Sequence, residues 1–561
     1  MPATTATIRR RMLWIALSVI LIAPAIGSDF LNDDYFFNSP IHQVDAPFGY
    51  YDFLSNRNVA MAPWWTSDEF QVRFFRPLAS LTLHLDVSLF ADNALPGHLH
   101  SALWLIILLL GAFAVFDRLL DHKTQRIAEP LFGLGLFTAW AAGWMSARHA
   151  IMGGTFAVWA TVFFVDGLRT EKRRPMAISM ALFVLGLLSS ESALPFAAVA
   201  LFFVVAHKDQ TRERIRFLLA PLLFGGAYIL FYKLAGYGAR GSDLYVDPLS
   251  APVDYLAALP SKMMALLGSF TFGIPAMLRI VPNTEVIAVT FGVLALITLV
   301  GLTLLRRPVL DSEQKKRVSL LFASFPVAML PEMSGMVEGR GSLLAGVLFC
   351  ALSATLLQGA FTKTHPRRHL CRFAAGVLFT GMLILSPLSR LGASIFIYMG
   401  AANLTRIGQN ANLGCARGQD IYQINADSLM AVMYPFVAAR YQGRFFNHWN
   451  QLGQAPRDLT LTRTGEETVR LEAKDGIVES YLWLFRKPTA DWQQDTPMAK
   501  DNLRATIIEK KKHTPTIVEF NLKGLQNDGV CLLRADGFLL KQLTIPPIGK
   551  SVVVPWVPPQ P

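Results

Sequence analysis

The chain enters its first apolar segment through the stretch RRRMLWIALSVILIAPAIGSDFLNDDY, which covers residues 9–35. Three arginines precede an apolar run over about residues 12–27, and an acidic, aromatic stretch follows it directly. Because further apolar runs follow, we expect an uncleaved transmembrane helix here rather than a removed signal peptide. The three arginines before this span are the first of the basic runs from which the topology is predicted.

The composition of the whole chain agrees with this start. Of 561 residues, 52% are hydrophobic and only 16% are charged, and the mean hydropathy is +0.37. Soluble domains carry about 25% charged residues, and disordered chains carry more. The sequence therefore predicts a mainly α, polytopic transmembrane helical bundle with the lipid bilayer as a partner. The net charge of +12 lies largely in short runs between apolar segments, so we predict no nucleic-acid partner.

The apolar runs and the basic loops together predict a topology of about 11 spans. After the first run, apolar segments lie near 99–117, 130–145, 150–168, 175–190, 192–206, 217–234, 284–305, 318–331, 341–360 and 373–389. The basic runs at 9–11, 118–126, 169–174, 208–216, 306–317 and 363–372 hold 23 Lys or Arg in 49 residues. The alternate loops hold 8 in 139 residues, so we predict a cytoplasmic N-terminus and an extracytoplasmic C-terminus. The localisation predicted from this pattern is a multi-pass protein of the bacterial inner membrane, with the C-terminal domain in the periplasm.

One apolar segment does not fit the count. Residues 262–283 are apolar enough to span, but a span here would place the five basic residues of 306–317 outside. We therefore interpret it as a re-entrant or interfacial segment, in which Pro275 and Pro282 break any helix.

Two domains are predicted. Residues 1–402 form the membrane domain with a first outer loop at 28–98, and residues 403–561 form a small extracytoplasmic β-rich α+β domain. Alternating strand patterns fall at Leu459–Thr464, Thr468–Glu472, Thr516–Leu522, Val530–Leu533 and Ser551–Val557. The segment 424–446 is typical of a helix. Cys415 and Cys531 both fall in this domain, where either a disulfide or two buried thiols would be compatible with the sequence.

The first outer loop carries the most chemistry. Asp33 and Asp34 follow the first span among aromatic residues, and neighbouring, partly buried carboxylates raise each other's pKa. Such a group suits a general base near neutral pH, although a helix cap or a solvated turn would explain the pair equally simply.

A pair of arginines follows in RFFRP, residues 73–77. On a helix, Arg73 and Arg76 would share a face and form a fork suited to phosphate. The simpler interpretation is pairing with the neighbouring Asp68 and Glu69. Arg148, Glu191, Glu338 and Arg340 also lie at predicted outer helix ends, and together these residues outline one polar cavity.

The order of these motifs resembles the GT-C class of integral-membrane glycosyltransferases, in particular the protein O-mannosyltransferase-like and aminoarabinose-transferase-like branches. The motifs are DDY at 33–35, RFFRPL at 73–78, LHLD at 83–86, LPGHLH at 95–100, WMSAR at 144–148, LLSSESALP at 187–195 and EGR at 338–340. The resemblance covers about residues 10–390. It departs from the family at Ser190, where a Lys is frequent, and at Gly341, where a Tyr is frequent.

The resemblance implies transfer of a sugar from a polyprenyl-phosphate-linked donor to a glycan, lipid or protein acceptor on the outer face. It implies Asp33 or Asp34 as the general base. It implies contacts to the donor phosphate or carrier from Arg73, Arg76, His100, Arg148 and Arg340, one of them oriented by Glu191. No cofactor is expected, and a divalent metal is left open. The alternative is a transporter or flippase for a lipid-linked or anionic substrate without covalent chemistry; against it, no internal repeat is visible.

Overall fold

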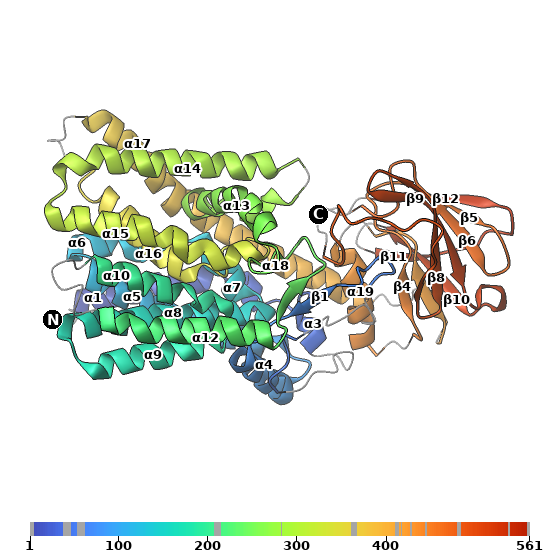
Figure 1. Ribbon diagram of the computed structural model, residues 1–561, viewed down its shortest axis with the longest axis horizontal. Coiled ribbons are helices and arrows are strands. Elements are labelled where there is room, and N and C mark those ends of the chain that lie inside the picture. The colour runs from blue at the N-terminus through green and yellow to red at the C-terminus, as the bar shows by residue number, and fades with distance from the viewer. Residues whose placement is uncertain are drawn as a thin grey trace.

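The computed structural model describes residues 5–37, 47–52, 62–206, 215–281, 283–360, 367–409, 414–416, 418–426, 429–443, 446–479, 484–536 and 539–557. The described chain is mainly helical, and its strands are concentrated in the C-terminal part. Figure 1 shows the helices lying side by side as an elongated bundle, with the C-terminal strands gathered beyond one end.

The helices have the following bounds: α1 Thr5–Leu21, α2 Ala23–Ile26, α3 Asp34–Phe37, α4 Pro77–Phe90, α5 Ala94–Leu119, α6 His122–Gly133, α7 Ala139–Gly143, α8 Arg148–Thr170, α9 Arg173–Leu187, α10 Pro195–Val205, α12 Leu219–Leu234, α13 Pro252–Phe272, α14 Glu285–Arg306, α15 Ser312–Met329, α16 Leu343–Leu357, α17 Arg368–Thr380, α18 Ser386–Gln409 and α19 Leu429–Tyr441.

Five helical segments in the described part of the chain are long and apolar enough to cross a membrane. They are Ala94–Leu119, Met145–Thr170, Ile215–Leu234, Glu285–Val309 and Arg368–Arg406. The chain is therefore an integral membrane protein. The other predicted runs fall on shorter helices, and the run at 130–145 is interrupted, because α6 ends at Gly133 and α7 covers only Ala139–Gly143. The count of eleven spans stays a prediction.

The predicted charge alternation is visible in the two ends of the bundle. Arg10 and Arg11 contact Glu129 at 2.7 and 2.8 Å, and Arg118 contacts Asp166 at 2.7 Å. These ion pairs lie at the end of the bundle that holds the N-terminus. The first outer loop, with α3, α4 and β1, lies at the end near the C-terminal strands. The runs at 208–216 and 363–372 lie partly outside the described residues.

The segment interpreted as re-entrant begins as a regular helix, α13, which ends at a left-handed Gly273. A short 3-10 turn at Ala276–Arg279 follows, and the Nη1 atom of Arg279 lies 3.4 Å from Oγ of Ser261. The chain therefore doubles back beside α13 before α14 begins. Of the two predicted helix breakers, Pro275 precedes this turn and Pro282 lies outside the described residues.

The C-terminal part contains two sheets. The strands are β3 Asp420–Gln423, β4 Trp449–Gln451, β5 Leu459–Arg463, β6 Thr468–Glu472, β7 Met498–Lys500, β8 Leu503–Lys511, β9 Thr514–Leu522, β10 Val530–Asp536, β11 Leu539–Leu543 and β12 Ser551–Val554. A six-stranded antiparallel sheet has the order β12-β5-β6-β9-β8-β7, and a four-stranded mixed sheet has the order β11-β10-β3-β4. Every predicted strand run is confirmed by one of these strands, and the predicted helix at 424–446 contains α19.

The first outer loop joins the bundle to this C-terminal part. Trp64 and Trp65 are buried in the core between the sheets, where Nε1 of Trp64 donates to the carbonyl of Leu452 at 3.1 Å. Strand β1, Gln71–Arg73, pairs with β2, Gly238–Arg240, so that the loop is also tied to the segment after α12. The structure joins Cys415 and Cys531 in a disulfide, which links the chain after α18 to β10.

Candidate active site

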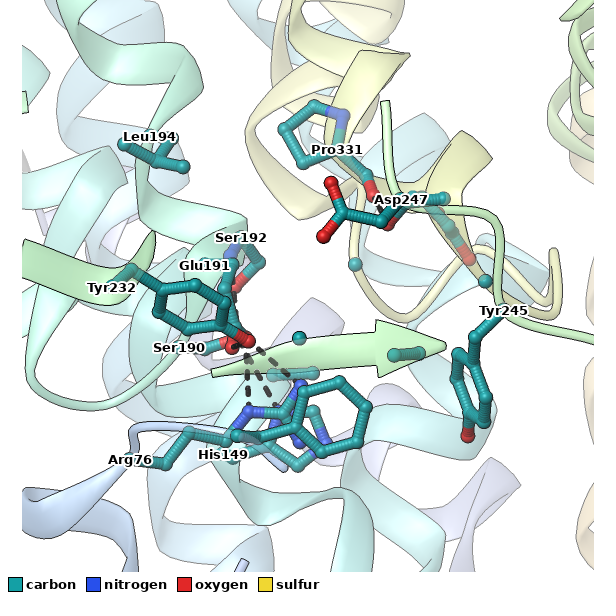
Figure 2. Close-up of a pocket in the computed structure, with 18 of the residues that line it drawn as sticks. Arg76, His149, Ser190, Glu191, Ser192, Leu194, Tyr232, Tyr245, Asp247 and Pro331 are labelled. Carbon is teal, nitrogen blue, oxygen red and sulfur yellow. Dashed lines mark hydrogen bonds and ion pairs between the residues drawn. The ribbon is translucent and has the colours of Figure 1, made fainter. Parts of the chain in front are cut away.

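A cavity of about 520 Å³ lies at the end of the bundle that faces the C-terminal strands. Four of the predicted site residues line it, namely Asp33, Arg76, Glu191 and Arg340. The other four, Asp34, Arg73, His100 and Arg148, are not among its lining residues. Figure 2 shows Arg76 and Glu191 pointing toward one another on one side, with Tyr245 and Asp247 on the other.

Asp33 reaches the cavity because the chain turns sharply just before it. Asn32 has a left-handed backbone with φ of 48°, a conformation that Asn tolerates better than most residues. The Oδ1 atom of Asp33 accepts a hydrogen bond of 2.5 Å from the hydroxyl of Tyr434. Burial raises the pKa of Asp33, while the Tyr434 hydrogen bond and the charge of Arg340 oppose that rise. A carboxylate poised in this way can accept a proton near neutral pH.

Asp34 has a different role from its neighbour. Its side chain is fully buried and accepts hydrogen bonds from the backbone N–H of Leu31 at 3.0 Å and of Ser146 at 2.8 Å. The Ser146 hydroxyl also donates to it. Burial raises the pKa of Asp34 to about 7. Through these contacts the Asp34 carboxylate holds the turn before α8. The two adjacent acids therefore differ in their surroundings, since only Asp33 lines the cavity.

Arg76 forms the polar centre of the opposite wall. Its Nε and Nη2 atoms lie 2.9 and 2.8 Å from Oε2 of Glu191, and its guanidinium stacks over the Phe74 ring at 4.1 Å. The hydroxyl of Tyr232 donates to Oε1 of Glu191 at 2.9 Å. Glu191 thus contacts both Arg76 and Tyr232 in this wall.

The expectation that Arg73 and Arg76 share a helical face is wrong. Arg73 ends strand β1, and α4 begins only at Pro77, so an extended segment separates the two side chains. Arg73 instead forms a two-pronged pair of 2.7 Å with Asp52 and lies over the Tyr237 ring. The expected pairing of the arginines with Asp68 and Glu69 is replaced by pairs with Asp52 and Glu191.

Arg148 and His100 belong to a buried cluster centred on Asp86. Arg148 is fully buried, pairs with Asp86 and donates to the Gly97 carbonyl at 2.7 Å. The Nδ1 atom of His100 lies 3.0 Å from the same carboxylate. This cluster anchors the first turn of α8 to α4 and α5, so these two residues are placed outside the cavity rather than at a phosphate.

Arg340 lies in the loop before α16. Its Nε atom lies 3.2 Å from Oε2 of Glu338, and its guanidinium stacks over the Trp144 ring at 4.9 Å. The loop is shaped by Glu332, which accepts hydrogen bonds from the backbone N–H of Glu338 at 2.9 Å and of Gly339 at 2.5 Å. Burial raises the pKa of both Glu332 and Glu338.

Several lining residues were missed by the sequence reasoning. His149 follows Arg148, and its Nδ1 atom lies 3.3 Å from the Ser190 hydroxyl. Lys233, at the end of α12, pairs with Asp247. Lys233 offered one usable signal, because a lysine at a predicted outer helix end opposes the positive-inside pattern. The remaining missed polar lining residues include Tyr51, Tyr228, Tyr232, Tyr245, Tyr255 and Glu332.

Part of the cavity lining is apolar, and helix α12 contributes Ile229 to it. The apolar lining residues include Leu194, Ile229, Leu249, Leu330 and Pro331. The outer side of α12 exposes further leucines, as a helix in contact with lipid does. Within the described ranges, no group of three or more His, Cys, Asp or Glu side chains is placed to hold a metal ion.

No protein-family model matches the sequence, and no curated protein sequence matches it. Similar solved structures include the Archaeoglobus fulgidus oligosaccharyltransferase with a tethered acceptor peptide, with 14% identity and a TM-score of 0.40. The alignment covers 77% of this chain and 63% of that one, so the chain spans less than two thirds of the archaeal protein. ArnT from Cupriavidus metallidurans, bound to undecaprenyl phosphate, has 11% identity and a TM-score of 0.38, with 78% and 85% covered.

A third similar structure is the arabinosyltransferase EmbB from Mycobacterium smegmatis, with 16% identity and a TM-score of 0.33. Its alignment covers 71% of this chain and 41% of the mycobacterial one.

Proposed function

We propose that this chain is a membrane glycosyltransferase that moves a sugar from a polyprenyl-phosphate donor to an acceptor at the outer face of the membrane. The observation that carries the proposal is the place of Asp33, whose carboxylate shares one cavity with Arg76 and Arg340. A base and fixed cations are the two groups that sugar transfer from a phosphate requires.

In the proposed reaction, a hydroxyl oxygen of the acceptor attacks the anomeric carbon from the side opposite the phosphate. The new carbon–oxygen bond forms while the bond from that carbon to the phosphate oxygen breaks and its electron pair leaves with the phosphate. The configuration at the anomeric carbon therefore inverts. The hydroxyl proton passes to the carboxylate of Asp33, which later returns it to water.

The cations of the cavity have a defined task in this reaction. Negative charge develops on the departing polyprenyl phosphate, and guanidinium groups fixed in a poorly solvated cavity stabilise it more than water would. Arg76 and Arg340 are the groups we assign to this task, with Lys233 as a third cation of the lining. The apolar part of the cavity lining, to which α12 contributes, is where we place the first isoprene units of the donor.

The finer topology belongs to the same proposal. Residues 1–402 are the membrane domain with about eleven spans, and residues 403–561 are the extracytoplasmic domain. The end of the bundle that holds Arg10 and Arg11 faces the cytoplasm, and the cavity faces the periplasm of a bacterial inner membrane. The excess of lysine and arginine in the first set of loops supports this orientation.

A transfer assay in native membranes tests the function. Radiolabelled hexosyl and pentosyl polyprenyl phosphates are supplied with and without a divalent metal chelator, and label is followed into glycans, lipids and proteins. The wild type should transfer label, and Asp33→Asn should lower the rate at least about 100-fold, because a general base contributes about that factor or more. Asp29→Asn is the matched control, since Asp29 accepts a bond from Thr405 and does not line the cavity.

Two outcomes contradict the proposal in different ways. Full activity of a well-folded Asp33→Asn variant would remove the assignment of the base. A folded wild type that transfers no sugar, yet moves labelled lipid across a vesicle membrane, would favour the alternative of a transporter or flippase.

A further inference from the structure

A tyrosine of the C-terminal part reaches Asp33, one of the residues that line the cavity. Tyr434 lies on α19, 401 positions along the chain from Asp33, and its hydroxyl donates the 2.5 Å hydrogen bond to that carboxylate. Figure 1 shows α19 between the end of the bundle and the sheets, close to α3. A lining residue of the cavity is thus held by a side chain that enters from outside the bundle.

The ring of Tyr434 is held firmly enough to aim this hydroxyl. Tyr434 is only 5% exposed, and its ring meets the Phe36 ring edge-on, with centroids 6.1 Å apart. On the far side of the same helix, Phe436 packs against Trp449 of β4. The bundle and the mixed sheet therefore fix α19 from both sides, so the hydroxyl costs little further ordering when it binds the carboxylate.

We propose that Tyr434 is a positioning residue for the carboxylate of Asp33, so that the C-terminal part completes the active site. The inference rests on the proposed function, in which Asp33 is the base. The hydroxyl can donate only one hydrogen bond, and it holds Oδ1, which leaves Oδ2 as the oxygen to receive the acceptor proton. The bond also favours the ionised state of Asp33, the state in which a base works.

Asp33 has other charged and titratable neighbours that enter any pH dependence. They are Asp34 beside it in the chain, Tyr245, Glu338 and Arg340 from the opposite loops, and Tyr434 itself. Burial raises the pKa of Asp33, and Tyr434 and Arg340 oppose that rise. Removal of the Tyr434 hydroxyl alone therefore moves the pKa of Asp33 further upward.

The test is the pH profile of kcat/KM for Tyr434→Phe, which keeps the ring and its packing and removes the hydroxyl. The acidic limb of the profile should move to higher pH, and the rate at the acidic end should fall about tenfold relative to wild type, the size of one hydrogen bond to a charged group. At alkaline pH the variant should recover most of the wild-type rate. Tyr441→Phe is the matched control on the same helix, because Tyr441 bonds Asp92 at 3.0 Å outside the cavity, and its profile should not move.

An unchanged profile of Tyr434→Phe, or a loss that is equal at every pH, would overturn the inference while the proposed function stood. A shift of the same size in Tyr441→Phe would also overturn it, since the effect would then be general to α19.

A second measurement does not depend on activity and keeps the two proposals separable. The full-length protein in detergent is unfolded thermally as wild type, Asp33→Asn, Tyr434→Phe and the double variant. The changes in Tm should be non-additive, because the two groups contact one another directly. Additive changes would show that the contact is absent, whatever the transfer assay reports.

Discussion

Two arginines at the same end of the bundle, Arg76 and Arg148, were both expected to contact the donor phosphate, and the structure gives them opposite surroundings. Arg148 has a fully buried side chain that pairs with Asp86 and donates to backbone carbonyls of neighbouring helices. Arg76 also pairs with a carboxylate, Glu191, but it lines the cavity and stacks on an aromatic ring. In the sequence, Arg76 belongs to the arginine pair of RFFRP and Arg148 lies alone at a predicted outer helix end.

The difference between the two arginines lies in how many hydrogen bonds of each guanidinium are already used within the protein. The guanidinium of Arg148 has its hydrogen bonds taken up by Asp86, Ser101 and Gly97, so a ligand would have to replace buried contacts. The guanidinium of Arg76 meets Glu191 through two nitrogens that share one oxygen, stacks on the Phe74 ring and lines the cavity. An ion pair of the second kind can rearrange around a phosphate without loss of the fold.

Arg148→Ala should have the largest effect, and the effect should be on folding. Removing one partner of a fully buried ion pair leaves Asp86 with an uncompensated charge, which costs about 3–5 kcal/mol of unfolding free energy. Detergent-induced unfolding of the purified protein in mixed micelles measures this loss. Arg76→Ala is the control, and its unfolding free energy should change less, because the Arg76 and Glu191 side chains are 11% and 22% exposed whereas those of Arg148 and Asp86 are 0% and 9% exposed. Equal losses of unfolding free energy in both variants would show that the two arginines contribute equally to the fold.

Arg76→Ala should instead lower activity with the fold intact. We expect kcat/KM for transfer to fall about 100-fold, the loss typical of removing one fixed group that stabilises charge in the transition state. Arg76→Lys keeps the charge and should lose less. Equal losses in the two variants would mean that the flat, two-nitrogen geometry of the guanidinium is needed, as in bidentate recognition of phosphate. Wild-type activity in Arg76→Ala would remove Arg76 from the site.

Much of the architecture could be predicted from local patterns. The alternating runs near Leu459 and Thr468 became β5 and β6, since period-two alternation is a property of the segment itself. The alternation of basic and acidic loops sorted the loops to opposite ends of the bundle before any contact was known. For the same reason, half of the predicted site residues do line the cavity: a functional cavity at one face collects the polar residues of that face.

The positions of the individual site residues depend on contacts between segments that are distant in the sequence, and no local pattern predicts such contacts. Asp33 and Asp34 diverge because Asn32 takes a left-handed turn and because Tyr434, 401 positions away, holds only the first of them. The three-residue spacing of Arg73 and Arg76 would place them on one face of a helix, but strand pairing with the segment after α12 holds Arg73 in β1. Neither the separation of the two acids nor the pairing of β1 leaves a periodic pattern in the sequence.

The smallest effect on activity is expected for Tyr232, which contacts the carboxylate that pairs with Arg76. Tyr232→Phe removes the hydroxyl that donates to Oε1 of Glu191 at 2.9 Å, while the ring stays in the wall. Because Tyr232 acts on Arg76 only through Glu191, kcat/KM should fall about fivefold, which is less than the full effect of about 1.5–3 kcal/mol for a hydrogen bond to a charged group. The unfolding free energy should change by no more than about 1 kcal/mol. Tyr237→Phe is the control, because Tyr237 lies outside the cavity lining and its ring, which packs against Tyr232 and Arg73, is kept in the variant. In Arg76→Ala the Tyr232→Phe change should have no further effect on activity, since the residue it acts through is gone; a full additional loss there would show that Tyr232 acts on the substrate directly.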